Sequence, residues 1–168
     1  MKAQFMQSGE NVSKEQLEKL GVDSWILDAD RWEEEGKLDQ ICKQRGYNYK
    51  DEVDSRKMPD LRSKLDNFLV EHIHDDEEIR FILEGGGYFD VRDAKSNSDD
   101  WIRITVEKGD MIVLPPGIYH RFLPDDNMFF HVMRLFQGEP VWTPHNRSDL
   151  TDQRKARLEY VKKYVEAN

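Results

Sequence analysis

The sequence predicts an all-β core, a sandwich or barrel of short strands, with N-terminal helices and one C-terminal helix packed on it. Three observations support this fold class. Short runs rich in β-forming residues alternate with turn residues between about residues 69 and 142. The N-terminal third is highly charged and contains helix-capping patterns, and an apolar stripe at helical spacing follows Pro144. We expect a single domain over residues 1–168, with a helical cover over about 1–68, a β-barrel over about 69–142 and a C-terminal helix over about 149–166.

The N-terminal third is expected to contain short helices and one strand. Capping residues, a proline in a first turn and a glycine after a last turn mark the helix boundaries. The expected elements are a helix between Ser13 and Gly21, a strand over 22–27, a helix over 38–45 that Gly46 ends, and a helix that Pro59 opens. Leu61, Leu65 and Phe68 recur at helical spacing, which gives the last of these helices a buried face.

Strand-like runs dominate the middle of the chain, and glycine, proline, asparagine and aspartate fill the segments between them. These runs cover residues 79–83, 88–91, 101–106, 111–114, 120–123 and 129–136. The glycine triplet at 85–87 is expected to turn the chain between the first two strands. In the C-terminal helix, one face should be apolar and the other solvated: Leu158, Val161 and Val165 against Lys155, Arg157 and Lys162.

Composition and charge exclude several classes of protein. The net charge is −9 and the acidic residues are spread along the chain, which argues against nucleic acid as a partner because phosphate binding needs a basic face. Cys42 is the only cysteine, so no intrachain disulfide can form, and we expect it to be a small core residue. No apolar run reaches membrane-spanning length, and residues 1–11 lack the apolar core of a signal peptide. We expect a monomer in the cytoplasm and leave a further nuclear location open.

A candidate metal site lies in residues 71–83. His72 and His74 are separated by one residue, and Glu78 has the same parity. Alternate side chains of an extended strand lie on one face, so these three can converge if no bulge intervenes. Arg80 follows on the same face. Two imidazoles and a carboxylate form a mixed nitrogen and oxygen site for a divalent transition metal.

Residues 109–120 supply a third imidazole, His120, after a short apolar strand and a Pro-Gly turn. The two segments together match the two-part cupin signature, in the form His72-x-His74-x3-Glu78-x6-Gly85 and Gly109-x5-Pro115-x-Gly117-x2-His120. We therefore expect the three histidines and the glutamate of this signature to bind one metal ion inside a cupin double-stranded β-helix, a jelly-roll barrel. His131 and His145 lie outside the signature and are expected to be structural.

These four ligands would leave two positions open on a six-coordinate metal, which suits a substrate that chelates through two oxygen atoms. The set accommodates Fe(II), Mn(II), Ni(II), Co(II) or Cu(II), and intrinsic affinity rises from manganese to copper. A closed zinc site is an alternative, although structural zinc sites favour cysteine. Cupins include oxygenases, isomerases and non-catalytic proteins, so the motif alone leaves the reaction open.

Further segments carry a more specific resemblance. They are Glu71-His72-Ile73-His74, Asp76-Glu77-Glu78-Ile79-Arg80, Gly87-Tyr88-Phe89-Asp90-Val91-Arg92-Asp93, Trp101-Ile102-Arg103-Ile104, Glu107-Lys108-Gly109-Asp110-Met111, Gly117-Ile118-Tyr119-His120-Arg121-Phe122 and Arg134-Leu135-Phe136-Gln137-Gly138-Glu139-Pro140-Val141-Trp142-Thr143. The chain resembles the acireductone dioxygenase family of methionine salvage in these segments, its eukaryotic branch above all, from about Val22 to the C-terminal helix. Asp66 and Pro124 depart from the general cupin pattern, but neither is a proposed ligand.

The resemblance implies a metal-dependent dioxygenase, an oxidoreductase that cleaves acireductone, 1,2-dihydroxy-3-oxo-5-(methylthio)pent-1-ene, with O2. It implies one Fe(II) or Ni(II) ion per chain. In this family the Fe(II) form yields 4-methylthio-2-oxobutanoate and formate, and the Ni(II) form yields 3-methylthiopropanoate, formate and carbon monoxide. The alternatives are a non-catalytic metal-binding cupin and an isomerase that uses the ion only as a Lewis acid. Oxygen uptake distinguishes the dioxygenase from both.

An anionic substrate that chelates a metal needs cationic neighbours. Arg80 lies on the ligand face by parity, and Arg134 is a charge within an apolar run. A buried charge is costly without an anionic partner, so we expect both arginines in the site, with an exposed Arg134 as the alternative. Phe81, Phe122 and Trp142 are candidates for lining the methylthioalkyl pocket, because sulfur packs well on aromatic faces, and ordinary core packing is the alternative.

Overall fold

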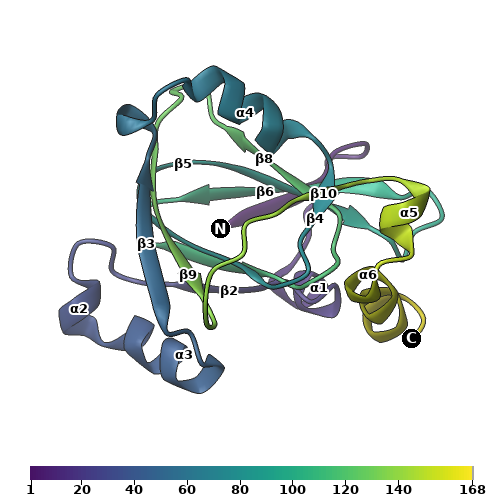
Figure 1. Ribbon diagram of the computed structural model, residues 1–168, viewed down its shortest axis with the longest axis horizontal. Coiled ribbons are helices and arrows are strands. Elements are labelled where there is room, and N and C mark those ends of the chain that lie inside the picture. Colours follow the sequence, from purple (N-terminus) through teal and green to yellow (C-terminus); the bar gives the residue numbers. More distant parts are fainter. Residues whose placement is uncertain (168) are drawn as a thin grey trace.

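The computed structural model describes residues 1–167 and consists of antiparallel strands with helices around them (Figure 1). The helices are α1 (Lys14–Lys19), α2 (Trp32–Glu35), α3 (Lys37–Arg45), α4 (Leu61–Leu69), α5 (Asp149–Asp152) and α6 (Lys155–Tyr160), with a 3₁₀ turn at Ser55–Lys57 and a π-helical turn at Val161–Val165. The strands are β1 (Lys2–Phe5), β2 (Asp23–Ile26), β3 (Tyr49–Asp54), β4 (His72–Ile73), β5 (Glu78–Asp93), β6 (Asp100–Glu107), β7 (Asp110–Leu114), β8 (His120–Pro124), β9 (Phe130–Phe136) and β10 (His145–Asn146). The predicted all-β core with helices packed on it is confirmed.

The long strand β5 belongs to two sheets. Its first half pairs with β7 and β9, and these pair in turn with β2 and β3. Its second half pairs with β6 and β8, in a sheet ordered β1-β6-β5-β8-β4-β10. One strand therefore connects both layers, and residues at its two ends lie in different sheets.

The glycine triplet marks the point where β5 passes from one sheet to the other, and it does not form the predicted turn between two strands. The register against β9 shifts between Ile82 and Glu84, which is a β-bulge. Gly85 follows with φ +71°, and a Cβ there would lie 2.2 Å from the carbonyl oxygen of Phe129. Glycine is required because no other residue fits that space. The chain therefore bends and continues where the sequence was expected to reverse.

The bulge exchanges the two faces of β5. Before it, Ile79 and Phe81 pack in a layer of apolar residues beneath α3, together with Ile41. After it, Phe89 and Val91 pack in the main core between the two sheets. A one-residue shift inverts which side chains point inward, so odd-numbered residues face outward before the bulge and inward after it.

The N-terminal third contributes strands as well as the predicted helices. The capping box is present, since the Ser13 hydroxyl accepts from the N–H of Gln16 and the Gln16 side chain accepts from the N–H of Ser13. Gly46 ends α3 with φ +77°, as predicted. However, β1 pairs with β6, and β3 pairs with β9, so the description of residues 1–68 as a helical cover was incomplete.

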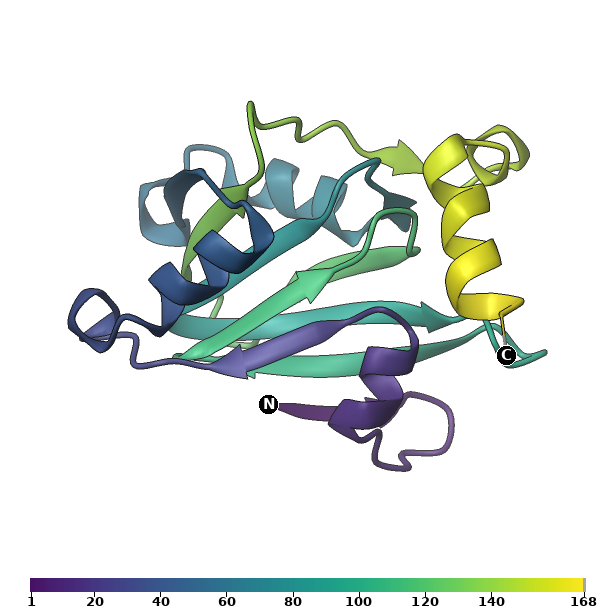
Figure 2. The same ribbon diagram turned by 90° about the horizontal axis from the view of Figure 1, so that it is seen from below.

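The predicted C-terminal helix is broken, and two residues, Leu158 and Arg157, were assigned to the wrong face. It consists of α5, α6 and a π-helical turn, at the opposite end of the molecule from α2 and α3 (Figure 2). Leu158 is half exposed, whereas Ala156, Arg157 and Tyr160 are buried. Arg157 donates to the carbonyl oxygen of Gly117 at 3.1 Å, so a side chain expected in solvent anchors the helix instead. None of the helices in residues 1–167 has the length and apolar character needed to traverse a membrane.

Candidate metal centre

Three histidines converge at one end of the space between the sheets. His72 on β4 pairs in register with His120 at the start of β8, and both are buried. His74 lies in the loop that joins β4 to β5. One potential ligand atom from each imidazole lies within 4.8 Å of the other two. The convergence predicted from parity is therefore present, but a loop produces part of it.

Backbone carbonyl groups fix the orientation of all three rings. The Nδ1 atoms lie 2.6, 3.0 and 2.9 Å from the carbonyl oxygens of Val70, Thr143 and Ile118 for His72, His74 and His120, respectively. A carbonyl oxygen only accepts, so each Nδ1 carries the proton of the neutral ring and each Nε2 keeps a free lone pair. This is the arrangement in which a protein orients imidazole ligands toward a metal.

Glu78, the first residue of β5, adds a carboxylate to this group. Its Oε2 lies 3.0 Å from Nε2 of His120, and its Oε1 lies 3.7 Å from Nε2 of His74. Nε2 of His120 is nevertheless buried without an aligned hydrogen bond, which is true of no other buried side-chain nitrogen or oxygen atom in residues 1–167. A buried polar atom without a partner is costly, and a metal ion would satisfy it.

The electrostatics of the site favour metal-binding protonation states. Burial lowers the pKa of His72 to about 4, and the neighbouring His120 acts in the same direction. Burial also lowers the pKa of His74. For Glu78, burial alone would raise the pKa, but Arg80 and the neighbouring imidazoles outweigh it and hold the pKa well below its ordinary value. Neutral imidazoles and an ionised carboxylate are the forms that bind metal, so these residues fit a divalent cation.

Two arginines lie beside the centre, as predicted, and both already have carboxylate partners. Arg80 donates from Nη2 to Oε1 of Glu78 at 2.9 Å. Arg134 on β9 donates to both oxygens of Asp51, at 2.7 and 2.6 Å. The Trp142 ring lies against both guanidinium groups, with its centroid 4.1 Å from Cζ of Arg134 and 5.6 Å from Cζ of Arg80.

A cavity of about 90 Å³ adjoins this group and has charged residues at one end and apolar walls elsewhere. Its lining consists of Glu78, Arg80 and Arg134 together with Val53, Phe68, Phe89, Phe122, Phe130 and Val132. Three aromatic rings meet here, since the Phe122 ring centroid lies 5.1 Å from that of Phe89 and 5.2 Å from that of Phe130. An apolar cavity with a few convergent polar groups is the usual form of a small-molecule site.

Of the three predicted pocket residues, one lines this cavity and two do not. Phe122 lines it. Phe81 does not, because its odd position before the bulge points it outward into the layer beneath α3. Trp142 stacks on the two arginines and packs against Phe136, so it lies beside the cavity rather than on its wall. Two wall residues, Phe130 and Val132, have the parity of Arg134 and could have been found from it.

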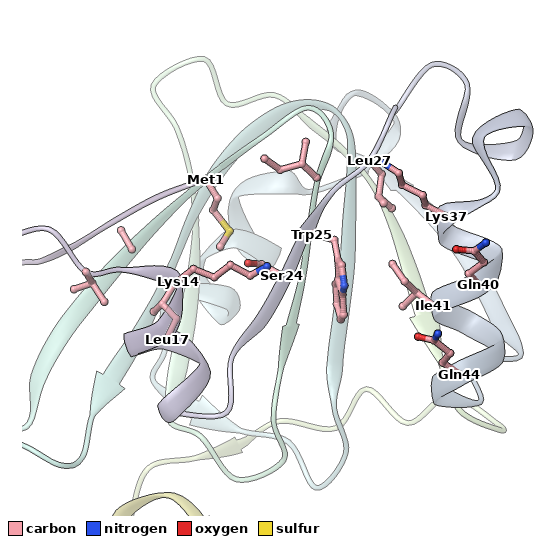
Figure 3. A pocket seen from close by; sticks show the side chains of 13 residues that line it. Met1, Lys14, Leu17, Ser24, Trp25, Leu27, Lys37, Gln40, Ile41 and Gln44 are labelled. Carbon is pink, nitrogen blue, oxygen red and sulfur yellow. The ribbon is translucent and has the colours of Figure 1, made fainter.

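A hollow near the N-terminus has different chemistry. It measures about 560 Å³ and lies between β1, α1, β2 and α3 (Figure 3). Figure 3 shows Trp25 and Ile41 facing each other on one side, with Lys14 and Leu17 on the other. Its lining contains no histidine, cysteine or acidic residue, so it offers none of the side-chain ligands that a transition metal requires.

The remaining histidines and the cysteine lie outside the centre, as predicted. Nε2 of His131 lies 2.8 Å from a carboxylate oxygen of Glu52, and Nε2 of His145 lies 3.4 Å from one of Asp75. His145 lies in the short strand β10 rather than in a loop. Cys42 is half-buried against the apolar layer beneath α3, and burial raises the pKa of its thiol.

Comparisons with known proteins agree with this geometry. The model of the ARD/ARD' family matches residues 2–144. A protein of Rattus norvegicus named acireductone dioxygenase is 54% identical over 153 residues, which cover 90% of this chain and 83% of that protein. A protein of Sorghum bicolor named probable inactive acireductone dioxygenase 2 is 51% identical over 158 residues, which cover 93% of this chain and 84% of that protein.

A solved structure shows the same fold. It is described as acireductone dioxygenase from Bacillus anthracis with a cadmium ion in its active center. The TM-score is 0.73 at 22% sequence identity, and the match covers 85% of this chain and 96% of that one. The fold is therefore shared across a large divergence in sequence.

Proposed function

The chain belongs to the ARD/ARD' family, and from this premise we propose that it is an acireductone dioxygenase that uses a divalent metal ion. The substrate would be acireductone, an enediol that binds as a chelating anion, and the co-substrate would be O2. The observation that carries the proposal is the group of three converging imidazoles, two of which have Nε2 within 3.7 Å of Glu78, with two arginines and an apolar cavity beside them. The presence of a probable inactive relative makes this local geometry, rather than family membership, the argument for activity.

We propose His72, His74, Glu78 and His120 as the metal ligands. All four offer nitrogen or oxygen donors, so the site selects weakly between Fe(II) and Ni(II), and intrinsic affinity favours Ni(II). The Bacillus anthracis protein of the same fold is described with a cadmium ion in its active center, which supports a divalent cation as the ligand of this site. When bound, the ion would supply Lewis acidity and two open positions for the oxygens of the substrate.

The protein groups around the ion would bind and orient the substrate anion. Arg80 and Arg134 place two positive charges at the charged end of the cavity. Positive groups held in a site that excludes water stabilise developing negative charge far better than they would in bulk solvent. The phenylalanine-lined walls would receive the methylthioalkyl tail, because aromatic faces pack well against sulfur.

Arg80 would have a second task, since it already donates to Glu78. That contact leaves the Oε2 atom of the carboxylate directed at His120 and orients Glu78 as a ligand. The pair of Arg134 and Asp51 restrains the other guanidinium group in the same way. Both arginines are therefore held in place before a substrate arrives, which lowers the entropic cost of binding it.

We propose that the ion selects between two sets of products. Fe(II) would give 4-methylthio-2-oxobutanoate and formate, and Ni(II) would give 3-methylthiopropanoate, formate and carbon monoxide. The test is to remove the metal, reload the protein with each ion separately, and measure oxygen uptake, keto acid and carbon monoxide with acireductone. Carbon monoxide from the nickel form alone supports the proposal. Turnover without oxygen uptake would favour the isomerase, and no turnover with either ion would favour the non-catalytic cupin.

We also propose that the protein acts as a monomer in the cytoplasm, with a nuclear location as a further possibility. Sedimentation of the metal-loaded protein would give the mass of one chain. A concentration-dependent increase in mass would contradict this.

A further inference from the structure

The segment from Thr143 to Arg157 crosses the loop that carries two of the proposed ligands. Its strand β10 lies beside β4 (Figure 1), with His145 opposite Ile73 and Asn146 opposite His72. The backbone N–H of Arg147 donates to the carbonyl oxygen of Glu71 at 3.0 Å. The segment therefore adds an edge strand directly behind the first ligand.

His74 is the ligand that depends most on this segment. Nδ1 of its ring lies 3.0 Å from the carbonyl oxygen of Thr143, so the segment itself orients the ring. The carbonyl oxygen of His74 accepts from the N–H of Gly117 at 3.0 Å. Gly117 is held in turn by Arg157, and a Cβ at Gly117 would lie 2.3 Å from the carbonyl oxygen of Ala156. Helix α6 thus fits closely against the turn that supports His74.

Ion pairs join the residues that flank the two histidines to the segment. Asp75 accepts from Nε and Nη2 of Arg154, at 3.1 and 2.7 Å. Glu71 accepts from Nη1 of Arg147 at 2.8 Å and from Arg92 at 2.8 and 3.1 Å. The carboxylates that flank the two histidines, Glu71 and Asp75, therefore pair with arginines.

We propose that the segment from Thr143 to Arg157 is a clasp that positions His74 for metal binding, with Asp75 and Arg154 as positioning residues. The inference deepens the proposed function and rests on its metal site. The Thr143 carbonyl group orients the ring only while the clasp lies against the loop, and Asp75 joins the two through its two-pronged pair with Arg154 and a longer contact of 3.4 Å with Nε2 of His145. Partners that orient metal-binding histidines typically contribute about 10–100-fold to metal affinity.

Substitutions that break the contact between the clasp and the loop should affect metal binding more than they affect folding. Both partners are about two-fifths exposed, and exposed ion pairs contribute little to global stability. Arg154→Met and Asp75→Asn should each weaken Co(II) binding about 10-fold, the lower end of the range for such partners. They should also alter the visible absorption of bound Co(II), because the orientation of one ligand changes. The melting temperature of the metal-free protein should remain close to that of the wild type.

The experiment is a Co(II) titration of metal-free protein, followed by absorption, with the double variant included. If Asp75 acts through Arg154, the double variant should bind Co(II) about as tightly as either single variant. Lys155→Met is the matched control, since Lys155 is the next residue, is highly exposed, and makes only a loose pair with Glu159 at 3.8 Å. It should leave both the affinity and the spectrum unchanged.

Unchanged Co(II) affinity and spectrum in both single variants would overturn the clasp, as would effects that multiply in the double variant. If Arg154→Met unfolds, Asp75→Asn decides the question, because it retains the arginine and the side-chain volume. Acireductone is absent from this titration. A wild-type protein that binds Co(II) but does not turn over acireductone would therefore contradict only the dioxygenase, and one that binds no Co(II) would contradict both proposals.

Discussion

Strand β5 carries a buried carboxylate near each end, and the two have different surroundings. Asp90 is fully buried and accepts three hydrogen bonds, at 2.9 and 3.0 Å from Arg103 and at 2.9 Å from Arg121. Glu78 accepts one hydrogen bond from Arg80, and its other oxygen faces His120 without an aligned hydrogen bond. Both are even-numbered, but the bulge between them places Glu78 inside and Asp90 on the outer side of its sheet.

The difference shows how a structural carboxylate can be distinguished from a ligand. Asp90 has its oxygens saturated by two guanidinium groups, so it has no capacity left for another cation. Glu78 retains an oxygen directed at a group of lone pairs, which is favourable only if a cation joins them. The Glu78 side chain is 12% exposed and that of Asp90 is fully buried, so both are largely removed from solvent, and the satisfaction of hydrogen bonds separates them.

The largest effect should come from changing Glu78. Glu78→Gln retains the size of the side chain but removes the negative charge, and we expect the protein to lose most of its metal and most of its activity. The loss of affinity should exceed the roughly 10–100-fold typical of an outer partner. Metal analysis after dialysis against a fixed free concentration measures it, with Glu77→Gln as the neighbouring control. Full metal content in the Glu78 variant would remove this residue from the ligand set.

Asp90→Asn should affect stability and leave the metal content at one ion per chain. Removing one member of a buried ion pair typically costs about 3–5 kcal/mol, and we expect about 3 because Arg103 and Arg121 are about one-quarter exposed. Urea unfolding of the metal-free protein measures the loss. If the Asp90 variant kept its stability but failed to bind metal, Asp90 would be a metal-site residue and not a structural carboxylate.

Arg80→Ala should still bind one metal ion when the ion is supplied in excess, although more weakly because Arg80 orients Glu78, and it should lower turnover of acireductone by roughly 100-fold through lost stabilisation of the substrate anion. Arg103→Ala is the matched control, because it removes a guanidinium group that pairs with the other carboxylate, Asp90. This variant should leave turnover unchanged. Metal content and steady-state kinetics are measured on the same preparations. Equal kinetics in the Arg80 variant and the wild type would show that this arginine serves only to pair with Glu78.

The smallest effect concerns Asp51, the partner of Arg134. The hydrogen bonds from Arg134 hold the pKa of Asp51 below its ordinary value. The stability that ionised Asp51 contributes to the folded protein is therefore complete at pH values above the pKa of Asp51 in the unfolded chain. It is lost as the pH falls through the lower pKa of Asp51 in the folded protein. Asp51→Asn should cost about 1 kcal/mol at neutral pH, because the pair is partly exposed. The difference from wild type in unfolding free energy should shrink between about pH 5 and pH 3, and a constant difference would contradict it.

Local patterns predicted the fold where a signal lies within a few residues. The capping box at Ser13, the end of α3 at Gly46 and the strands that became β6 and β7 needed only neighbouring residues. The glycine triplet misled because the same residues permit a turn or a close passage between sheets, and only the distant carbonyl groups decide between them. The strand β3 was missed because its charged residues pair with β9, which lies far along the chain, as in the pair of Asp51 with Arg134.

The candidate site shows the same division. Alternation along the chain placed Glu78 and Arg80 on one side because both precede the bulge. The same rule excludes Phe81 from that side, so its assignment to the pocket contradicted the parity argument used for its neighbours. The place of Phe89 on the cavity wall could not be predicted by alternation, because the bulge lies between Glu78 and Phe89 and reverses the faces of the strand. The carboxylate partner of Arg134 was also hidden, because Asp51 reaches it only through pairing of β3 with β9.

The bulge in β5 also predicts where the protein can tolerate an inserted or deleted residue. A residue inserted or deleted between Glu78 and Ile82 would exchange the faces of every residue on one side of it, and the carboxylate or the cavity wall would then point outward. One inserted in the loop over Ser96–Asp99, beyond the end of the strand, would displace neither face. Viable variation in length among relatives should therefore concentrate in such loops and be absent from the first five residues of β5. The alternation of side chains along β5 assigns each residue to one face, and the bulge between Ile82 and Glu84 is the single point where that assignment changes.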